Sequence, residues 1–206
     1  MLLLLVACRE TPAPDLPLKN VITTAQATTR DTSILSAKEW TFTLRGETYR
    51  LARDGRFTCG TRGSFQLDLG ELPYVDQLQY VPHGSEILIV LYEQSDGEGS
   101  TSKVARVYLP DCELAFASEI PGFNLGTAAL EGSKLYVSTI GFVGRFDVET
   151  WGYDWTHGNL YERHRFNAFE APVIYRERVV FREVRSDARP PRSVVVDKLS
   201  GAIRIE

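Results

Sequence analysis

Apolar and polar residues alternate over most of the chain beyond residue 37, which is the pattern of half-buried β-strands. The alternation is clear over residues 40–44 and 47–52, and Asp54-Gly55 separates the latter from residues 56–59. Asp-Gly between two alternating segments is the strongest short signal of a β-hairpin. The domain is therefore predicted to begin with antiparallel hairpins.

The same short apolar runs continue to the end of the chain, separated by turn residues such as Pro110-Asp111 and Glu131-Gly132. No segment beyond residue 37 has the spacing of an amphipathic helix. Short strands with turn signals every 8–12 residues or so predict an all-β sandwich, barrel or propeller. The predicted later strands are 86–92, 103–109, 112–117, 127–130, 134–140, 142–148, 153–157, 171–174, 178–184, 192–197 and 202–205.

A repeat favours the propeller among these architectures. Residues 144–155 align with residues 192–203: in each copy a strand ends in Asp, a turn containing Gly follows, and an apolar strand begins. An apolar run precedes each copy, and a less regular copy spans residues 86–116. The period of about 45 residues is typical of four-stranded propeller blades.

The segment from Lys134 to Trp155 resembles the quinoprotein-type (PQQ-like) β-propeller repeat, in which a strand ending in Asp is followed by Thr-Gly and an aromatic residue. In this chain Trp151 stands between Thr150 and Gly152, and the second copy has Ser200-Gly201 without the final Trp. The resemblance implies an all-β fold, a small or incomplete β-propeller of antiparallel hairpin blades. Four small blades would fit residues 37–206, and a β-sandwich is the alternative. The family includes outer-membrane assembly lipoproteins and quinoprotein dehydrogenases.

The N-terminal residues Leu5-Val6-Ala7-Cys8 resemble a bacterial lipobox, which implies cleavage before Cys8 and lipidation of its thiol. The apolar run is far below the roughly 18 residues of a membrane-spanning helix. A secretory signal also needs a basic n-region, so this interpretation requires a start further upstream. The alternatives are an apolar N-terminus without fixed structure and a buried first strand.

Residues 9–36 are rich in Thr and Pro and contain few large apolar side chains. Such a segment buries too little surface to offset the entropy lost on ordering. We therefore expect a lipoprotein signal remnant over residues 1–8, a flexible tether over 9–36 and a propeller-like domain over 37–206. Arg9 follows Cys8, where an Asp in lipoproteins is associated with inner-membrane retention. The expected location is the cell envelope, on the outer membrane facing the periplasm.

Two cysteines remain in the domain, Cys59 and Cys112. An even pair in an exported protein predicts a disulfide. In the chain-entropy model, closing a loop of this length stabilises a fold by about 4 kcal/mol. The alternative is two unrelated buried thiols.

The formal net charge is −4, and the charges are unevenly distributed. Residues 64–102 contain seven acidic residues and no Lys or Arg, whereas the last 46 residues contain more basic than acidic side chains. A nucleic-acid-binding protein would present a strongly basic stripe, so no nucleic-acid partner is predicted.

Two groups of residues are candidates for partner binding. Aromatic and Arg side chains supply contact area and directional hydrogen bonds, so one candidate patch comprises Trp151, Trp155, His157, Tyr161, His164 and Arg165. Packing of the tryptophans between blades is the alternative. The second group is the acidic loop region of Glu93, Asp96 and Glu98, which suits Ca²⁺ or a basic protein surface, or is simply a solvated loop.

Sequence motifs for catalysis are absent: there is no Gly-x-Ser-x-Gly, His-Glu-x-x-His, phosphate loop or Cys-x-x-Cys. His83, His157 and His164 are the only histidines, and none belongs to a recognisable triad. His157 and His164 with Glu162 are weak evidence for a metal site. We predict no catalytic residues, no metal and no cofactor.

The predicted function is therefore a membrane-anchored, non-enzymatic propeller-like lipoprotein that binds a protein partner in the envelope. One alternative is a periplasmic immunity or inhibitor lipoprotein that neutralises a toxin or hydrolase. Another is a degenerate quinoprotein-like cofactor binder.

Overall fold

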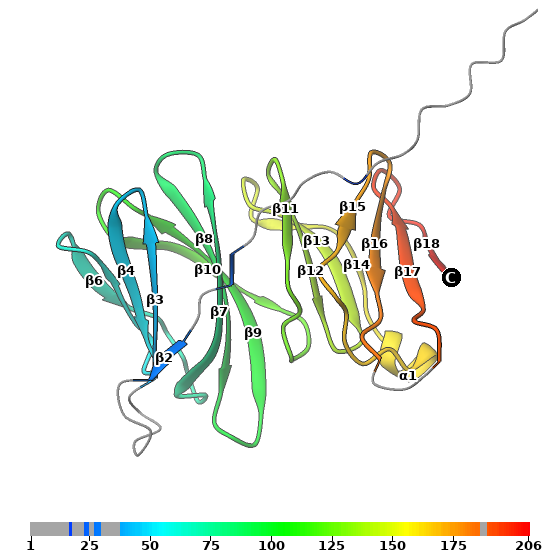
Figure 1. Ribbon diagram of the computed structural model, residues 1–206, viewed down its shortest axis with the longest axis horizontal. Helices are drawn as coiled ribbons and strands as arrows, with labels where there is room; N and C mark the ends of the chain where they lie inside the picture. The colour runs from blue at the N-terminus through cyan, green and yellow to red at the C-terminus, as the bar shows by residue number, and fades with distance from the viewer. Residues whose placement is uncertain (1–16, 18–22, 25–26, 30–37, 186–188) are drawn as a thin grey trace, which may run out of the picture.

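The computed structural model describes residues 17, 23–24, 27–29, 38–185 and 189–206. The described strands form four antiparallel sheets that stand side by side in a row (Figure 1). Strands that follow one another in the chain are hydrogen-bonded neighbours, so each sheet is built as a hairpin meander. The exception is β1 (Thr23–Thr24), which is added to the second sheet beside β7 (Tyr74–His83). We call the sheets blades 1 to 4 in chain order.

Blades 1 and 2 hold the larger part of the chain. Blade 1 consists of β2 (Ala27–Thr29), β3 (Lys38–Leu44), β4 (Glu47–Ala52), β5 (Arg56–Cys59) and β6 (Gly63–Gln66). Blade 2 consists of β1 (Thr23–Thr24), β7 (Tyr74–His83), β8 (Ile87–Ser95), β9 (Ser100–Tyr108) and β10 (Glu113–Ile120).

Blades 3 and 4 contain four strands each. Blade 3 consists of β11 (Ala129–Glu131), β12 (Lys134–Thr139), β13 (Phe142–Asp147) and β14 (Gly152–His157). The one-turn helix α1 (Leu160–His164) follows it. Blade 4 consists of β15 (Val173–Ile174), β16 (Arg178–Arg182), β17 (Ser193–Asp197) and β18 (Ile203–Ile205).

This architecture confirms the predicted incomplete β-propeller of antiparallel hairpin blades. The two copies of the sequence repeat occupy equivalent places: residues 144–155 cover the third and fourth strands of blade 3, and residues 192–203 cover those of blade 4. None of the helices in the described part of the chain is long and apolar enough to cross a membrane.

The segment 9–36, expected to be a flexible tether, contains two short strands. β1 pairs with β7, and β2 pairs with β3. These two strands cover the outer edges of β7 and β3, whose N–H and C=O groups would otherwise lack backbone partners there. Cys8 and, except for Pro17, the remainder of the segment lie outside the described residues, so the lipidation site stays a prediction.

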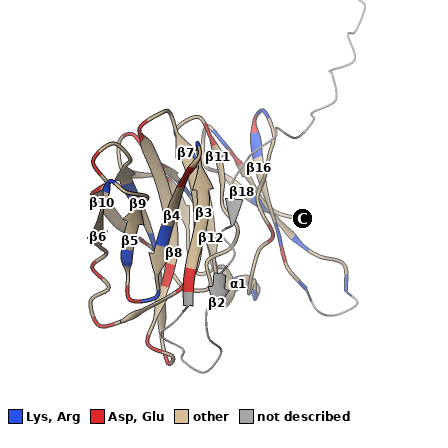
Figure 2. Ribbon diagram, turned by 60° about the vertical axis from the view of Figure 1, so that its left-hand side comes forward, with Lys and Arg blue, Asp and Glu red and all other residues tan. Residues whose placement is uncertain are grey.

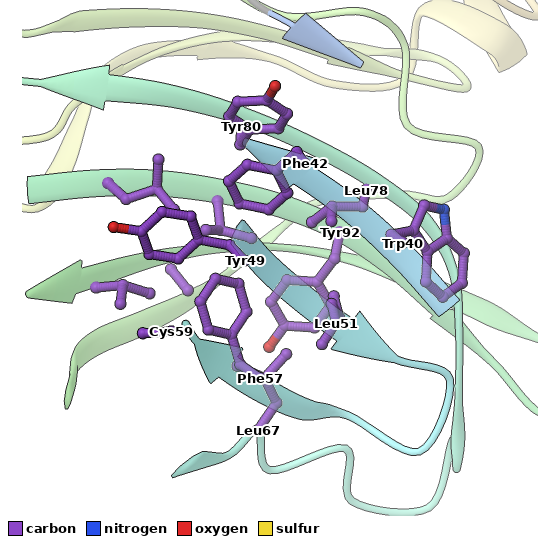
Figure 3. Packing of buried hydrophobic residues seen from close by; sticks show 14 of the residues in the cluster. Trp40, Phe42, Tyr49, Leu51, Phe57, Cys59, Leu67, Leu78, Tyr80 and Tyr92 are labelled. Carbon is purple, nitrogen blue, oxygen red and sulfur yellow. The ribbon is translucent and has the colours of Figure 1, made fainter. Parts of the chain in front are cut away.

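Three apolar cores join the four blades. Blades 1 and 2 pack through aromatic side chains, among them Phe42, Tyr49 and Tyr80, which stack on one another (Figure 3). The opposite face of blade 2 packs on blade 3 through Ile89, Leu91 and their neighbours. The opposite face of blade 3 packs on blade 4. Blades 2 and 3 are therefore buried on both faces, and their central strands carry nearly continuous apolar runs.

The turns along one edge of the row bind the blades to each other; this edge is uppermost in Figure 1, and we call it the tied rim. Arg45 donates from Nη2 to the carbonyl of Gly84 at 2.8 Å, and Arg62 donates to that of Leu109 at 2.7 Å. Lys198 donates from Nζ to Glu131 at 2.8 Å, which joins blades 4 and 3.

The predicted disulfide between Cys59 and Cys112 is confirmed and belongs to the tied rim. The Cα atoms of the two residues are 5.7 Å apart, and the bond links the last part of β5 to the turn before β10. It joins blades 1 and 2 at the end of their shared core, where both cysteines are buried.

Candidate binding groove

The opposite edge of the row carries longer connections, and we call it the loop rim. It lies at the lower edge in Figure 1, on the side of α1. Within the described residues it is formed by the connections that follow β4, β6, β8, β10, β12, β14 and β16. Its largest parts are residues 67–73, 96–99, 121–128, 140–141 and 158–172.

Three contiguous pockets lie on the loop rim, and together they form what we call the rim groove. The central pocket, of about 580 Å³, is lined by Phe123, Phe142 and Tyr161. Phe123 also lines an acidic pocket of about 440 Å³. Asn167 is shared between the central pocket and a basic pocket of about 640 Å³. The groove therefore passes from acidic through aromatic to basic surroundings.

Phe123 is held between blades 2 and 3 by its own backbone. Its carbonyl accepts a hydrogen bond from the Ile140 N–H at 2.9 Å. Two residues later, the Leu125 N–H donates to Glu93 at 2.7 Å, and the Leu125 carbonyl accepts from Gln77 at 3.0 Å. The loop is thus fixed, while 47% of Phe123 remains exposed. An immobilised but exposed aromatic side chain is a preorganised contact for a partner.

Tyr161 is fixed in a similar way, through α1. The Leu160 N–H donates to the Gly141 carbonyl at 2.9 Å, so the start of the helix sits on the turn between β12 and β13. A Cβ atom at Gly141, whose φ is +67°, would lie 2.8 Å from that of Tyr161. Only Gly permits this approach, which leaves Tyr161 40% exposed at the groove.

The acidic pocket contains two of the three acids predicted from the sequence. Glu93 is 8% exposed and holds the Leu125 N–H, whereas Glu98 is exposed. Asp76 also lines the pocket and accepts from Ser95. Asp96 instead shapes the turn: it accepts the N–H groups of Gly99 and Glu98, and these hydrogen bonds lower the pKa of its carboxyl.

The basic pocket contains His164 and Arg165 from the predicted patch, together with Arg192. The Arg192 guanidinium forms its hydrogen bonds within the protein: it donates to the buried Glu183 at 2.9 Å and to the His164 carbonyl at 2.7 Å. The hydrogen bond from Arg192 holds the pKa of Glu183 below its ordinary value, although burial opposes this. Figure 2 shows further basic positions along and beside β16.

The predicted aromatic patch is divided between the rim and the spaces between blades. Tyr161, His164 and Arg165 are exposed on or next to α1. Trp151 packs between Phe116 and Phe146, and Trp155 packs against Tyr136 and the core of blades 3 and 4. His157 lies 2.7 Å from the Gly201 carbonyl, measured from Nε2. Trp151, Trp155 and His157 therefore make contacts between neighbouring blades. For the two tryptophans this is the arrangement that the packing alternative describes.

Phe123 and Asp76 were not among the sequence candidates. The Pro121-Gly122 dipeptide before Phe123 is a turn signal, which places Phe123 in a loop, but nothing local indicates that its ring is exposed. Nothing near Asp76 in sequence distinguishes it from other surface acids. Among the described residues, no three His, Cys, Asp or Glu side chains gather closely enough to hold a metal ion.

No family of known proteins matches the chain in a scan of family models, and no curated protein matches it. Solved structures do match in fold. BamB from Moraxella catarrhalis aligns at 13% identity with a TM-score of 0.51 over 90% of this chain and 51% of its own. Sqt1 from Saccharomyces cerevisiae aligns at 8% identity with a TM-score of 0.50, over 90% and 48%.

Both matched structures are β-propellers, so the likeness is one of fold. The chain spans about half the length of each. This agrees with a row of four blades in which blades 1 and 4 lie at opposite ends (Figure 1). The chain is thus an incomplete β-propeller with a groove along one rim.

Proposed function

We propose that this chain is a non-enzymatic binding protein of the cell envelope, anchored through a lipid on Cys8, that holds a protein partner on its loop rim. The rim groove is the observation that carries this proposal. Exposed aromatic side chains on fixed loops, with charged groups beside them, are what protein interfaces use as anchors. On the tied rim, the polar side chains of Arg45, Arg62 and Lys198 join neighbouring blades.

The location is supported by two features of the chain. The residues before Cys8 resemble a lipobox, and a disulfide joins Cys59 to Cys112. Disulfides persist in oxidising compartments such as the periplasm and are rare in the cytosol. Mass spectrometry of the native N-terminus tests the anchor: an acylated Cys8 is expected, and an unmodified N-terminus upstream of it would refute the anchor.

Site-specific photo-cross-linking in cells tests the partner. A photoreactive amino acid at Phe123 should give one discrete protein adduct, because this side chain lies at the centre of the groove. Leu199 is the matched control, since it is 94% exposed but lies in the β17–β18 turn on the tied rim. Equal adducts from the two positions, or none from Phe123, would refute binding at the loop rim. The identity of the adduct also separates an envelope partner from a toxin.

A further inference from the structure

We infer that the rim groove binds an extended polypeptide segment in which an apolar side chain lies between a basic residue and an acidic residue. This inference rests on the proposed function and specifies the chemistry of the partner. The apolar side chain would enter the central pocket, the basic one the acidic pocket, and the acidic one the neighbourhood of Arg165.

The order of the pockets sets the shape of the ligand. Phe123 separates the acidic pocket from the central one, and Asn167 lies between the central pocket and the basic one. A ligand that occupies all three must therefore run along the rim rather than insert at one point. An extended peptide does this at low cost, because its side chains can reach separate pockets from one backbone.

Each end of the groove carries an exposed charge for a ligand. Asp76, Glu93 and Glu98 line the acidic pocket. Asp76 pairs with Arg53 at 3.4 Å and Glu93 is buried, so Glu98 is the exposed acid of this pocket. Glu98 and Arg165 are both exposed, and neither forms an ion pair with any described residue. Opposite charges on a ligand would gain attraction at both ends and fix its direction.

The opposite signs also argue against other classes of ligand. Nucleic acids and anionic membrane surfaces present one sign of charge and favour uniformly basic sites. Each would be repelled by the acidic end of this groove. A peptide with separated charges is complementary to both ends.

Labelled synthetic peptides provide the test. The parent peptide is acetyl-Lys-Lys-Gly-Phe-Gly-Glu-Glu-amide, made also with two or three Gly in each spacer. Three companions replace the Lys pair, the Phe or the Glu pair with Ser. Fluorescence anisotropy with the oxidised full-length protein should show saturable binding of at least one parent, weakened roughly three- to tenfold by loss of either charged pair.

Protein variants then locate each contact. Glu98→Ala should weaken only the peptides that keep Lys, and Arg165→Asn only those that keep Glu. Asn is chosen because Arg165 has φ +60°, a left-handed conformation that Asn tolerates. Phe123→Ala should weaken every peptide that contains Phe. Glu113→Ala, on β10 away from the groove, is the control variant and should change nothing.

The outcomes separate this inference from the proposed function. If no parent peptide binds but Phe123 still cross-links a partner, the peptide inference is wrong and the proposed function stands. It is equally overturned if Glu98→Ala weakens the Lys and Ser peptides to the same extent. Unchanged melting curves for Glu98→Ala, Arg165→Asn and Phe123→Ala establish that lost binding is not lost folding.

Discussion

At the scale of single residues, the Asp that ends the third strand of a blade organises the turn after it. Asp147 accepts the N–H groups of Glu149 and Thr150, at 2.7 and 3.2 Å. Asp197 does the same for Leu199 and Ser200 in blade 4. The repeated Asp is therefore explained by turn geometry, in which a short carboxylate replaces missing backbone acceptors.

Replacing Asp147 with Asn should destabilise the protein in a pH-dependent way. Burial raises the pKa of Asp147, but hydrogen bonds from Lys134 and from the Glu149 and Thr150 N–H groups lower it to about 2. The unfolded value is about 3.9, so the folded state favours the charged form and gains stability on the order of 2 kcal/mol above pH 4 or so. That contribution disappears as pH falls from about 4 to 2.

Urea unfolding at pH 7 and pH 2.5 measures this effect. The difference between wild type and Asp147→Asn should be largest at pH 7 and shrink at pH 2.5. Asp197→Asn is the control, and its effect should be smaller because Asp197 is exposed and has no Lys partner among the described residues. A difference for Asp147→Asn that does not depend on pH would contradict the account.

Trp151 adopts a left-handed backbone conformation that is unfavourable for a residue with a large side chain. It has φ +58° four residues after Asp147, and Gly201 has φ +71° four residues after Asp197. The amide of each donates to the carbonyl of its Asp at 2.9 Å. Trp151 thus takes a position that suits Gly, at a cost of about 1–2 kcal/mol. Its ring packs on Phe146 and the Arg106 guanidinium.

The variant Trp151→Gly separates these two contributions. It removes the backbone strain but also the packing of a large ring, which is worth about 3–5 kcal/mol when fully buried. Because Trp151 is half-buried, we expect a net loss of about 1–2 kcal/mol in the free energy of urea unfolding. A gain in stability would mean that the ring contributes less than the strain costs.

At the scale of elements, strands with simple alternation were predictable and the longest strand was not. β4 and β5 begin and end as the sequence predicts. β7 was missed, since Asp76, Gln77, Gln79 and Pro82 interrupt its apolar pattern. Gln79 is fully buried because it donates to the Gly126 carbonyl and accepts from the Ala128 N–H. Because polar residues of β7 bind a loop distant in sequence, β7 lacks the alternation of apolar and polar residues by which strands are recognised.

The candidate site was predictable only in part, for a related reason. Glu98, Tyr161 and Arg165 stand out as charged or aromatic residues in loops, and they do lie on one rim. The groove itself depends on Phe123, whose place is set by hydrogen bonds to Ile140 and through Leu125 to Glu93. Those contacts join different blades, so no local stretch of sequence encodes them.

The disulfide between Cys59, at the end of β5, and Cys112, in the turn before β10, should stabilise the folded protein. Cys59→Ser should lower the melting temperature in non-reducing buffer, with a loss of about 4 kcal/mol in the chain-entropy model. In strong reductant, wild type and variant should melt alike, because the wild-type thiols are then free as well. Identical melting curves in non-reducing buffer would contradict a stabilising link.

At the scale of the whole molecule, burial is greatest in the middle of the row. Both faces of blades 2 and 3 are covered, whereas blades 1 and 4 each contribute one face to a core. Contacts are made only between neighbouring blades in the three cores, as in repeat proteins. Stability should therefore decrease from the centre towards both ends.

Native-state hydrogen exchange measures that gradient. Amides of β8, β12 and β13 should exchange most slowly, and those of β6 and β18, the last strands of the end blades, most quickly. The reason is that opening a central strand breaks two cores, and opening an end strand disturbs one at most. Equal protection in all four blades would contradict this and indicate a single cooperative unit.

Blade-joining side chains and exposed groove side chains lie on different rims, and this has a consequence for how the binding specificity of the protein can change. Side chains that fasten one sheet to the next are concentrated at Arg45, Arg62, Lys198 and the cystine, whereas Glu98, Tyr161 and Arg165 point to solvent on the other side. Substitutions of the exposed groove residues that change which ligand is bound leave the side chains that join the sheets unchanged. Such a scaffold can acquire a new specificity in a few substitutions, each nearly neutral for folding, and is a natural starting point for engineered recognition.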